Sequence, residues 1–483
     1  MAITRLQDAA DILSPPQKRE IARPRFNQAA LVGAIFMFAL LIALYIASID
    51  IWATRGASIT GDEPFYLLTT QSLLQDGDLD LRQQYAQRSY ESFFDHPGGL
   101  WQQSVPREDG VLLSPHNPGL SVLLLPGFVI AGLVGAQVQM LVMAALTFAL
   151  TYVLVVSLTR ESLWSWAATM LIALSATAFI YSTEIYPEIP AALALVASLI
   201  ILQSKERPGL WLAVALAGCV TALMWLGIKY APLAALVAVW FFWRAESHAR
   251  LALLVVGGLS AAFFAWFHLE TFGGLTPYAV GVVHASDSTS SIISQHIAFW
   301  ERSYRLWGLF IDANFGIGRW SPVLLPVVPA LLLLWRRSGL SRLALALVAA
   351  QILMATFVAI TFMGWWFPGR TLMTVLPLLA LPLALLLAQL PMWGRVGIGL
   401  LGAYSLAVTA ALAKAAQARE IVIAVDPFDM QSSVFRVSNI LFPDYTYWNL
   451  ETWGLTAAWL LLGGAAISVM YLASSASNDK PHS

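Results

Sequence analysis

The chain has 483 residues, of which 58% are hydrophobic and only 11% are charged, and its formal net charge is -1. Soluble domains carry roughly 25% charged residues, so this composition excludes a soluble globular protein. No basic patch of the kind that binds nucleic acid is present, and the single cysteine, Cys219, excludes an intramolecular disulfide and a multi-cysteine metal site.

The apolar runs are long and continuous, which predicts an all-α polytopic membrane protein and not a β-barrel. Residues 1–28 are polar and basic, so we expect a cytoplasmic N-terminal segment followed by an uncleaved signal anchor. Because each crossing needs about 20 apolar residues, we predict about 12 transmembrane helices. Their approximate ranges are 29–49, 137–158, 163–182, 189–203, 210–228, 231–243, 250–269, 321–335, 342–361, 371–389, 396–413 and 454–473.

One further apolar stretch, residues 118–133, begins at Asn117-Pro118-Gly119 and carries Pro126-Gly127 in its middle. If this stretch crosses the membrane, every basic loop after it moves to the outside, against the rule that Lys and Arg stay inside. We therefore predict that it dips into the outer leaflet and returns, and that both termini are cytoplasmic. The basic loops in question contain Arg160, Lys205, Arg207, Arg244, Arg250, Arg336, Arg337, Arg342 and Arg395.

This topology turns three long polar segments outward: residues 50–117, 270–320 and 414–453. Long loops in a compact fold are usually functional or disordered, and these are rich in aromatic residues, which disfavours disorder. We expect a catalytic transmembrane domain over 29–413, an outer cap over 414–453, and a last span with a cytoplasmic tail over 454–483. Two short outer turns, 181–190 and 361–371, face the same side.

The acidic pair Asp62-Glu63, followed by Pro64, lies just beyond the outer end of the first span. One interpretation is a helix start, since proline and acidic side chains suit the first helical turn. The other is a general base: a carboxylate in a partly desolvated cleft at the membrane surface can deprotonate an attacking hydroxyl.

Two other motifs in the first outer segment have both a structural and a functional interpretation. Asp76-Gly77-Asp78-Leu79-Asp80 resembles a calcium loop only superficially, because the continuation and terminal Glu of an EF-hand are missing, so turn formation is the default. His116 is either structural or a contact for an anionic head group.

Several short motifs, in this order along the chain, resemble the GT-C superfamily of membrane glycosyltransferases. The branch that they resemble depends on a phospholipid carrier and includes protein O-mannosyltransferases and the aminoarabinose transferase of lipid A. The motifs are Asp62-Glu63 with Tyr66, His116-Asn117-Pro118-Gly119-Leu120, an acidic residue in the next outer turn, Trp307-Gly308-Leu309-Phe310, Phe315-Gly316-Ile317-Gly318-Arg319-Trp320-Ser321-Pro322 and Gly364-Trp365-Trp366-Phe367-Pro368-Gly369-Arg370.

The resemblance implies an enzyme that moves a sugar from a polyprenyl-phosphate donor to an acceptor hydroxyl on the extracytoplasmic face, with inversion. It implies that Asp62 is the catalytic base, with Glu63 beside it, and that Glu188 or Glu184 is the second acid. Relatives have His-Pro-Pro where this chain has His116-Asn117-Pro118, so the role of His116 is less defined.

A lipid-linked phosphate at the interface needs cations, and arginine and lysine on the outer side are candidates. The alternative for each is an interfacial anchor whose charge reaches toward water. We expect Tyr66, Trp365, Trp366 and Glu184 to line the substrate site. The candidate phosphate ligands are His116, Lys229, Arg302, Arg305, Arg319 and Arg370.

The reaction needs no covalent nucleophile, because polyprenyl phosphate is a competent leaving group once its charge is neutralised. No cofactor is required by the sequence. Asp62, Glu63, Glu184, Glu188 and His116 could still form an oxygen-rich site for a divalent metal. The expected partners are the lipid-linked donor, membrane lipid and a glycan, lipid or protein acceptor, in an inner membrane with the site facing outward.

The alternative function is a transporter or flippase for a lipid-linked sugar. Such a protein would place charges near the bilayer midplane, whereas here Lys229, His268 and Glu270 lie near span ends. A non-enzymatic scaffold of an envelope complex is a third hypothesis, and for it Asp62 and Glu63 would be dispensable.

Overall fold

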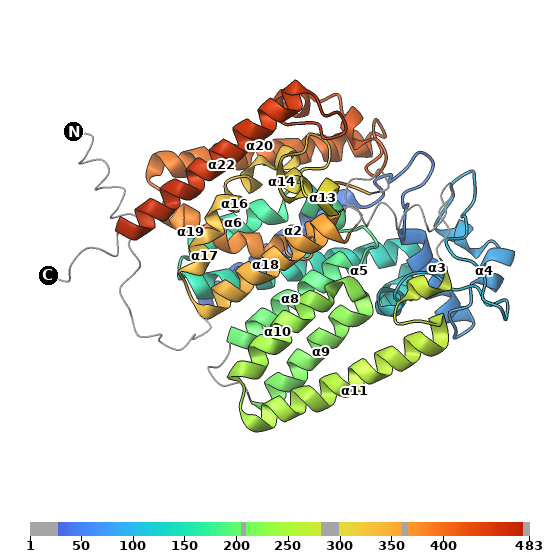
Figure 1. The fold of residues 1–483 in the computed structure, drawn as a ribbon. Helices are drawn as coiled ribbons and strands as arrows, with labels where there is room; N and C mark the ends of the chain where they lie inside the picture. Colours follow the sequence, from blue (N-terminus) through green and yellow to red (C-terminus); the bar gives the residue numbers. More distant parts are fainter. Residues whose placement is uncertain (1–27, 204–208, 282–298, 360–365, 477–483) are drawn as a thin grey trace, which may run out of the picture.

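The computed structural model describes residues 28–203, 209–281, 299–359 and 366–476. Within these ranges the chain is helical, with no β-strand and one isolated bridge between Thr54 and Ala57, which confirms the all-α prediction. The long helices lie alongside one another, and the segment that carries α3 and α4 gathers at one end of the bundle (Figure 1). We call this end the polar end. The predicted N-terminal segment 1–28 lies outside the described residues except for Gln28, as do Lys205, Arg207, Gly364 and Trp365.

Six of the described helices are long and apolar enough to cross a membrane, so the chain is an integral membrane protein. The remaining predicted spans correspond to shorter apolar helices, so the number of about 12 crossings stays a prediction. The six long helices are α2 (Gln28–Tyr45), α5 (Gly119–Thr159), α11 (Ser247–Phe272), α18 (Gly339–Phe357), α20 (Met392–Gln417) and α22 (Leu450–Ala476). The shorter ones are α6 (Ser162–Ala173), α8 (Glu188–Gln203), α9 (Leu210–Leu226), α10 (Ala231–Arg244), α16 (Val327–Ala330), α17 (Leu332–Trp335) and α19 (Ala380–Gln389).

Helix α5 is broken at Ala131 and Gly132, whose backbone angles are not helical. The chain reverses there, because Gln139 accepts a hydrogen bond from the amide of Gly127 (2.9 Å) and donates one to the carbonyl of Leu123 (2.6 Å). The first part of α5 therefore folds back on the second as a hairpin. This geometry agrees with the expectation, from the charged loops, that residues 118–133 do not cross; the depth of the hairpin in a membrane stays a prediction.

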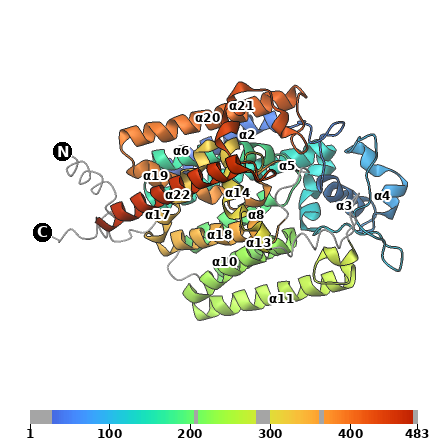
Figure 2. The same cartoon turned by 45° about the horizontal axis from the view of Figure 1, so that its top comes forward.

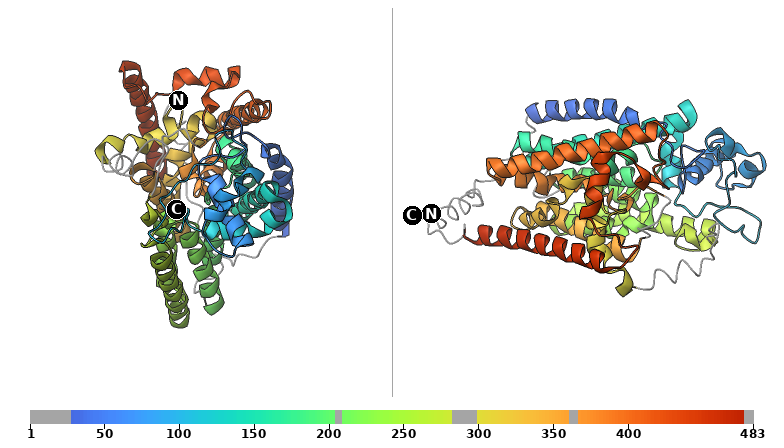
Figure 3. Two further views of the ribbon diagram at one scale, coloured as in Figure 1. Left: turned by 90° about the vertical axis from the view of Figure 1, so that its right-hand side faces the viewer. Right: turned by 90° about the horizontal axis from the view of Figure 1, so that it is seen from above.

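The second part of α5 lies at the centre of the bundle and packs against α2, α6, α8 and α19. Figure 2 places α11 at one edge of the bundle, opposite α20. In Figure 1 and in the left view of Figure 3, helices α9 to α11 and helix α22 lie at opposite edges. Their outward faces are apolar and exposed, as at Leu259 (68%) and Leu461 (74%). Apolar faces of this kind match a lipid environment, where the backbone is satisfied within each helix.

Short helices and 3-10 turns connect the longer helices. They are α3 (Glu63–Gln75), α4 (Arg82–Ala86), α7 (Ala176–Tyr181), α13 (Phe299–Arg302), α14 (Arg305–Ile311), α15 (Ile317–Trp320) and α21 (Ser433–Ser438), with 3-10 turns η3 (Ile228–Tyr230), η4 (Pro277–Val280), η5 (Pro322–Leu324), η6 (Arg370–Leu372) and η7 (Leu376–Leu379).

The segment 414–453, predicted as a cap, is fastened to two other polar segments. The amide of Ile423 donates to the carbonyl of Trp52 (3.0 Å), and the amide of Tyr445 donates to the Asp312 carboxylate (3.2 Å). Phe435 is fully buried against the indole of Trp320, with ring centroids 4.4 Å apart. These contacts order the segment 414–453; that it caps a substrate site stays a prediction.

Candidate active site

Asp62 precedes the first residue of α3, where a short polar side chain normally caps the helix. Here its carboxylate makes no capping hydrogen bond. Pro64 in the first turn supplies a fixed backbone angle that suits a helix start without that cap. The Asp62 carboxylate is therefore free to face other segments of the chain, and it keeps 22% of its side-chain exposure.

Arg370 begins η6 directly after a tight turn that depends on Gly369. Gly369 has φ +90°, and a Cβ there would lie 2.7 Å from Thr177 Oγ1 and from Ile317 Cγ2, so a side chain does not fit. Helix α7 fixes the turn through two hydrogen bonds. The Thr177 hydroxyl donates to the carbonyl of Pro368 (3.1 Å), and the Tyr181 hydroxyl donates to the carbonyl of Phe367 (2.6 Å). These contacts explain why glycine precedes the arginine in the sequence motif.

Four charged side chains from four distant segments form an alternating chain of ion pairs. Arg370 contacts the carboxylate of Asp62 through Nη2 (2.8 Å) and that of Glu188 through Nε (3.1 Å). Lys229, from η3, contacts the same Glu188 oxygen at 2.7 Å. Arg370 and Glu188 are buried, whereas the Lys229 side chain keeps 38% exposure. We call Asp62, Arg370, Glu188 and Lys229 the charged chain.

Two aromatic rings hold the guanidinium of Arg370 in place. Its central carbon lies 3.8 Å from the ring centroid of Tyr186 and 4.8 Å from that of Trp366, distances typical of cation–π contacts. Tyr186 also donates a hydrogen bond to the carbonyl of Thr60 (3.3 Å), two residues before Asp62. Trp366 therefore packs against Arg370; that it lines a substrate site stays a prediction.

His116 approaches Asp62 from the end of the first polar segment. Its Nε2 lies 3.7 Å from Asp62 Oδ1 and 2.7 Å from Gln103 Oε1, and its ring is 4.9 Å from the ring of Tyr66. The residues that follow are packed tightly, because a Cβ on Gly119 would lie 2.3 Å from the carbonyl oxygen of Trp225. His116 and Tyr66 thus belong to the same site as Asp62.

The charge of Asp62 is stabilised at neutral pH by its neighbours. Burial alone would raise the pKa of this carboxyl group, but the charges of Arg370 and His116 and the hydrogen bond from Arg370 overcome it and lower the pKa to about 2. Asp62 is therefore an ionised carboxylate that is both accessible and held in a defined geometry.

Glu63 and Glu184 are buried next to the charged chain and are not part of it. Glu63 is 1% exposed, and its two oxygens accept the amides of Ile185 (2.8 Å) and Thr60 (2.9 Å). Glu184 is buried and hydrogen-bonded to Glu63. The predicted contact of these two side chains with a substrate stays a prediction, and their backbone partners point to another role.

The other predicted phosphate ligands have different partners. Arg302 donates to the carbonyl of Phe357 (2.9 Å) and to that of Ala359, so it covers the end of α18. Arg319 is 4% exposed, donates to the carbonyl of Ala313 (2.6 Å) and lies 3.8 Å from the ring centroid of Phe435 under the cap. Arg305 begins α14, 6.0 Å from the ring centroid of Tyr304. The contacts described for these three arginines lie elsewhere in the chain, so we do not include them in the proposed site.

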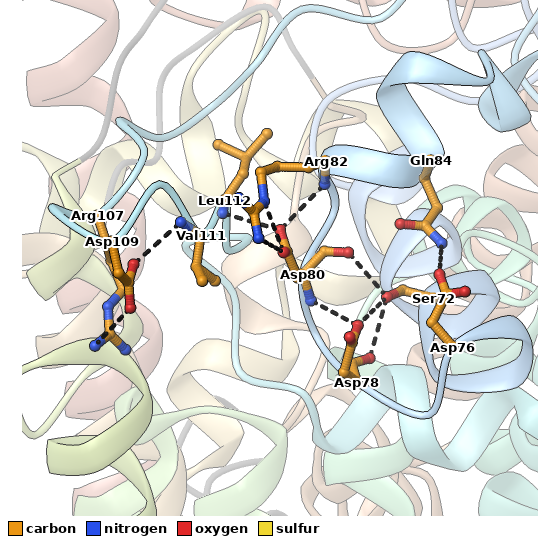
Figure 4. A network of polar contacts seen from close by, with 10 residues as sticks. All are labelled: Ser72, Asp76, Asp78, Asp80, Arg82, Gln84, Arg107, Asp109, Val111 and Leu112. Carbon is orange, nitrogen blue, oxygen red and sulfur yellow. Dashed lines mark hydrogen bonds and ion pairs between the residues drawn. The ribbon is translucent and has the colours of Figure 1, made fainter.

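The acidic run Asp76 to Asp80 forms a hydrogen-bonded turn (Figure 4). Asp78 accepts from the Ser72 hydroxyl (3.0 Å) and the amide of Asp80 (3.0 Å), and Asp80 pairs with Arg82 at 2.7 Å. These carboxylates are occupied by local partners, as the turn interpretation predicts. Across the described part of the chain, no three His, Cys, Asp or Glu side chains are placed to hold a metal ion.

Three residues at the site had not been singled out from the sequence. Tyr186 and Gln103 contact Arg370 and His116, and Tyr278 lies within electrostatic range of Asp62. The sequence gives one signal for these residues, because Tyr186 lies between the two acidic residues of the second outer turn. Gln103 and Tyr278 are isolated polar residues in long loops, with no motif around them.

Among solved structures, the chain is similar to ArnT from Cupriavidus metallidurans in the apo state, with 12% identity, a TM-score of 0.50, and coverage of 92% of this chain and 78% of that one. It is also similar to the same protein bound to undecaprenyl phosphate, with 14% identity, a TM-score of 0.46, and coverage of 92% and 76%. The similarity to the apo structure concerns the fold, and for the fold it confirms the resemblance that the sequence motifs predict. No family model and no curated protein sequence matches the chain.

Proposed function

We propose that this protein is an inverting glycosyltransferase that moves a sugar from a polyprenyl-phosphate carrier to an acceptor hydroxyl at the outer surface of the membrane. The observation that carries the proposal is the charged chain, in which an ionised, accessible Asp62 lies beside cations suited to a phosphate. The fold similarity to ArnT supports the same class of reaction. Charged side chains placed together at one end of a membrane bundle are usually functional.

In the proposed reaction, the acceptor hydroxyl loses its proton to Asp62 while its oxygen attacks the anomeric carbon. A new carbon–oxygen bond forms, the bond to the phosphate oxygen breaks on the opposite face, and polyprenyl phosphate leaves with the electron pair. Arg370 and Lys229 stabilise the charge that develops on this leaving group. The enzyme thus needs orientation, two cations and one base, but no covalent intermediate.

The resting ion pair also gives a reason for ordered binding. Paired with Arg370, the Asp62 carboxylate has a pKa of about 2 and is a weak base. A donor phosphate that attracts Arg370 and Lys229 would weaken the pair with Asp62, and the basicity of Asp62 would then rise. The base is therefore activated by the arrival of the donor.

The proposal includes the topology that the site requires. Both termini are cytoplasmic, about 12 helices cross the inner membrane, and the polar end faces the periplasm or cell exterior. In this orientation the α5 hairpin lies in the outer leaflet, and the cap formed by residues 414–453 lies over the site and contributes to acceptor choice. Labelling of cysteines introduced at residues 160 and 205 from the outside would contradict this topology.

The test uses the purified full chain in nanodiscs with a panel of polyprenyl-phosphate sugars, in which transfer or donor hydrolysis is measured. Wild type is compared with Asp62→Asn, and Asp78→Asn serves as a matched control in the same polar segment. We expect Asp62→Asn to lose about 100-fold or more in turnover, as for removal of a general base, and the control to keep it.

Each outcome separates the candidate functions. Equal turnover in wild type and Asp62→Asn would contradict the assignment of the base. Movement of a labelled donor across the bilayer, with no covalent transfer from any donor, would favour the transporter alternative.

A further inference from the structure

Two buried carboxyl groups connect the segments that carry the two acids of the charged chain. Glu63 is adjacent to Asp62, and Glu184 lies one turn before Glu188, the first residue of α8. The Glu63 carboxylate joins the two segments directly, because one oxygen accepts the amide of Thr60 and the other accepts that of Ile185, 122 residues away.

We propose that Glu63 and Glu184 form a proton-sharing carboxyl pair that positions Asp62 and Glu188 around Arg370; this inference rests on the proposed function of the charged chain. In this role the pair does not touch the substrate. Glu63 is the fixed acceptor at the junction, and Glu184 is the donor that completes its hydrogen-bond shell.

The hydrogen-bond pattern decides which member keeps the proton. Two buried carboxyl groups in contact cannot both ionise without strong repulsion. Glu63 accepts two backbone N–H donors, which favours its charged form. No such backbone donor to the Glu184 carboxyl group is described, so we assign the proton to Glu184, which donates it toward Glu63. Burial raises the pKa of Glu63 to about 7, and burial together with the charge of Glu63 raises the pKa of Glu184.

The surroundings of the pair fit a single negative charge. The cation that acts on both carboxyl groups is Arg370, and the hydroxyls of Tyr181 and Tyr186 also lie within their electrostatic range. A second negative charge would add repulsion at the junction, and it would draw Arg370 away from Asp62. Once Glu63 is ionised, the shared proton therefore holds the junction at a single negative charge, which preserves the geometry of the charged chain.

Three variants test the pair in the transfer assay. Glu184→Gln keeps one N–H donor for Glu63, and we expect it to retain turnover within about twofold. Glu184→Ala leaves Glu63 without this donor, and we expect about a tenfold loss in kcat with donor KM unchanged. Glu63→Gln places an amide N–H against a backbone N–H, and we expect about a 100-fold loss in kcat.

The pH profile gives a second readout, which a purely structural role would not move. In wild type, turnover should rise to a plateau as Glu63 ionises near pH 7 and should fall only at a higher pH, where the pair loses the proton held by Glu184. In Glu184→Gln the fall at high pH should be absent. Equal loss in Glu184→Gln and Glu184→Ala, or a Glu63→Gln variant with wild-type turnover and pH profile, would overturn the inference.

A measurement without any substrate separates this inference from the proposed function. Because the folded pair binds a proton that the unfolded chain releases above about pH 4.5, wild-type stability should fall, relative to Glu184→Gln, as pH rises from about 5 to 8. The unfolding temperature in nanodiscs, followed by tryptophan fluorescence, reports this difference. Parallel profiles would overturn the pair even if transfer is observed, whereas divergent profiles with no transfer would retain the pair and reject the enzyme.

Discussion

The first polar segment contains two acidic clusters, Asp62-Glu63 and Asp76 to Asp80, that look alike in the sequence but belong to different networks with arginine in the structure. Asp80 and Arg82 pair within one turn, where the arginine side chain is 56% exposed. Asp62 pairs with Arg370 across 308 residues, and the arginine is 8% exposed. Local exposed pairs contribute little to stability, whereas a buried cation depends on its partners.

This difference shows which ion pairs form locally and which depend on the tertiary structure. The carboxylates of the Asp76–Asp80 turn bond mainly to residues nearby in the chain, and their partner from a more distant segment is the amide of Leu112. The charged chain exists only when the segments around residues 62, 188, 229 and 370 meet. We therefore expect changes in the two networks to have effects of very different size.

The largest effect is expected at Arg370. Arg370→Met leaves Asp62 and Glu188 without their shared partner, which should cost about 3–5 kcal/mol in unfolding free energy and remove detectable transfer. Arg370→Lys keeps the charge but cannot contact Asp62 and Glu188 through two separate nitrogens. We therefore expect it to be more stable than Arg370→Met but less active than wild type. Thermal unfolding and the transfer assay measure both. An Arg370→Met protein as stable and active as wild type would remove the distinction between the two networks.

A smaller, more selective effect is expected at Lys229, the half-exposed end of the charged chain. Lys229→Gln keeps a donor for Glu188 but removes the charge available to a phosphate, so donor KM should rise about tenfold with little change in stability. Titration of donor in the transfer assay measures this change. A loss confined to kcat would contradict a phosphate-binding role for Lys229.

The smallest effect is expected in the turn. Asp80→Asn removes the charge that pairs with Arg82 but keeps an oxygen for the amide of Leu112. Turnover should stay within about twofold of wild type, since surface substitutions of this kind have small effects. A large loss of turnover in Asp80→Asn, with its unfolding temperature unchanged, would indicate that this turn also belongs to the site.

Much of the site could be predicted from residue type and position along the chain. Asp62, Glu188, Lys229 and Arg370 lie near the ends of predicted spans, and His116 precedes the stretch predicted to dip into the membrane. The structure brings these five residues together. The charge rule also indicated that residues 118–133 should not cross, and the reversal at Ala131 and Gly132 agrees with it.

Other site predictions depended on side-chain direction, which the sequence does not specify. Arg319 occurs in a motif as suggestive as that of Arg370, yet it points under the cap to Phe435 and the carbonyl of Ala313. Glu63 is adjacent to Asp62, but its carboxylate turns to the amides of Thr60 and Ile185. On a helix start, neighbouring side chains leave the axis in different directions, so adjacency in the chain does not mean a shared site.

The sequence by itself determined that this is a helical membrane protein, because 58% hydrophobic residues in long runs must be buried in lipid or in one another. It also determined which scarce charges were available for chemistry. Only the tertiary structure decided which of them meet, because partners such as Arg370 and Glu188 are 182 residues apart and are brought together by helix packing. Burial then determined how strongly these charged side chains depend on one another, since a charge inside the bundle must have an opposite charge or a hydrogen bond.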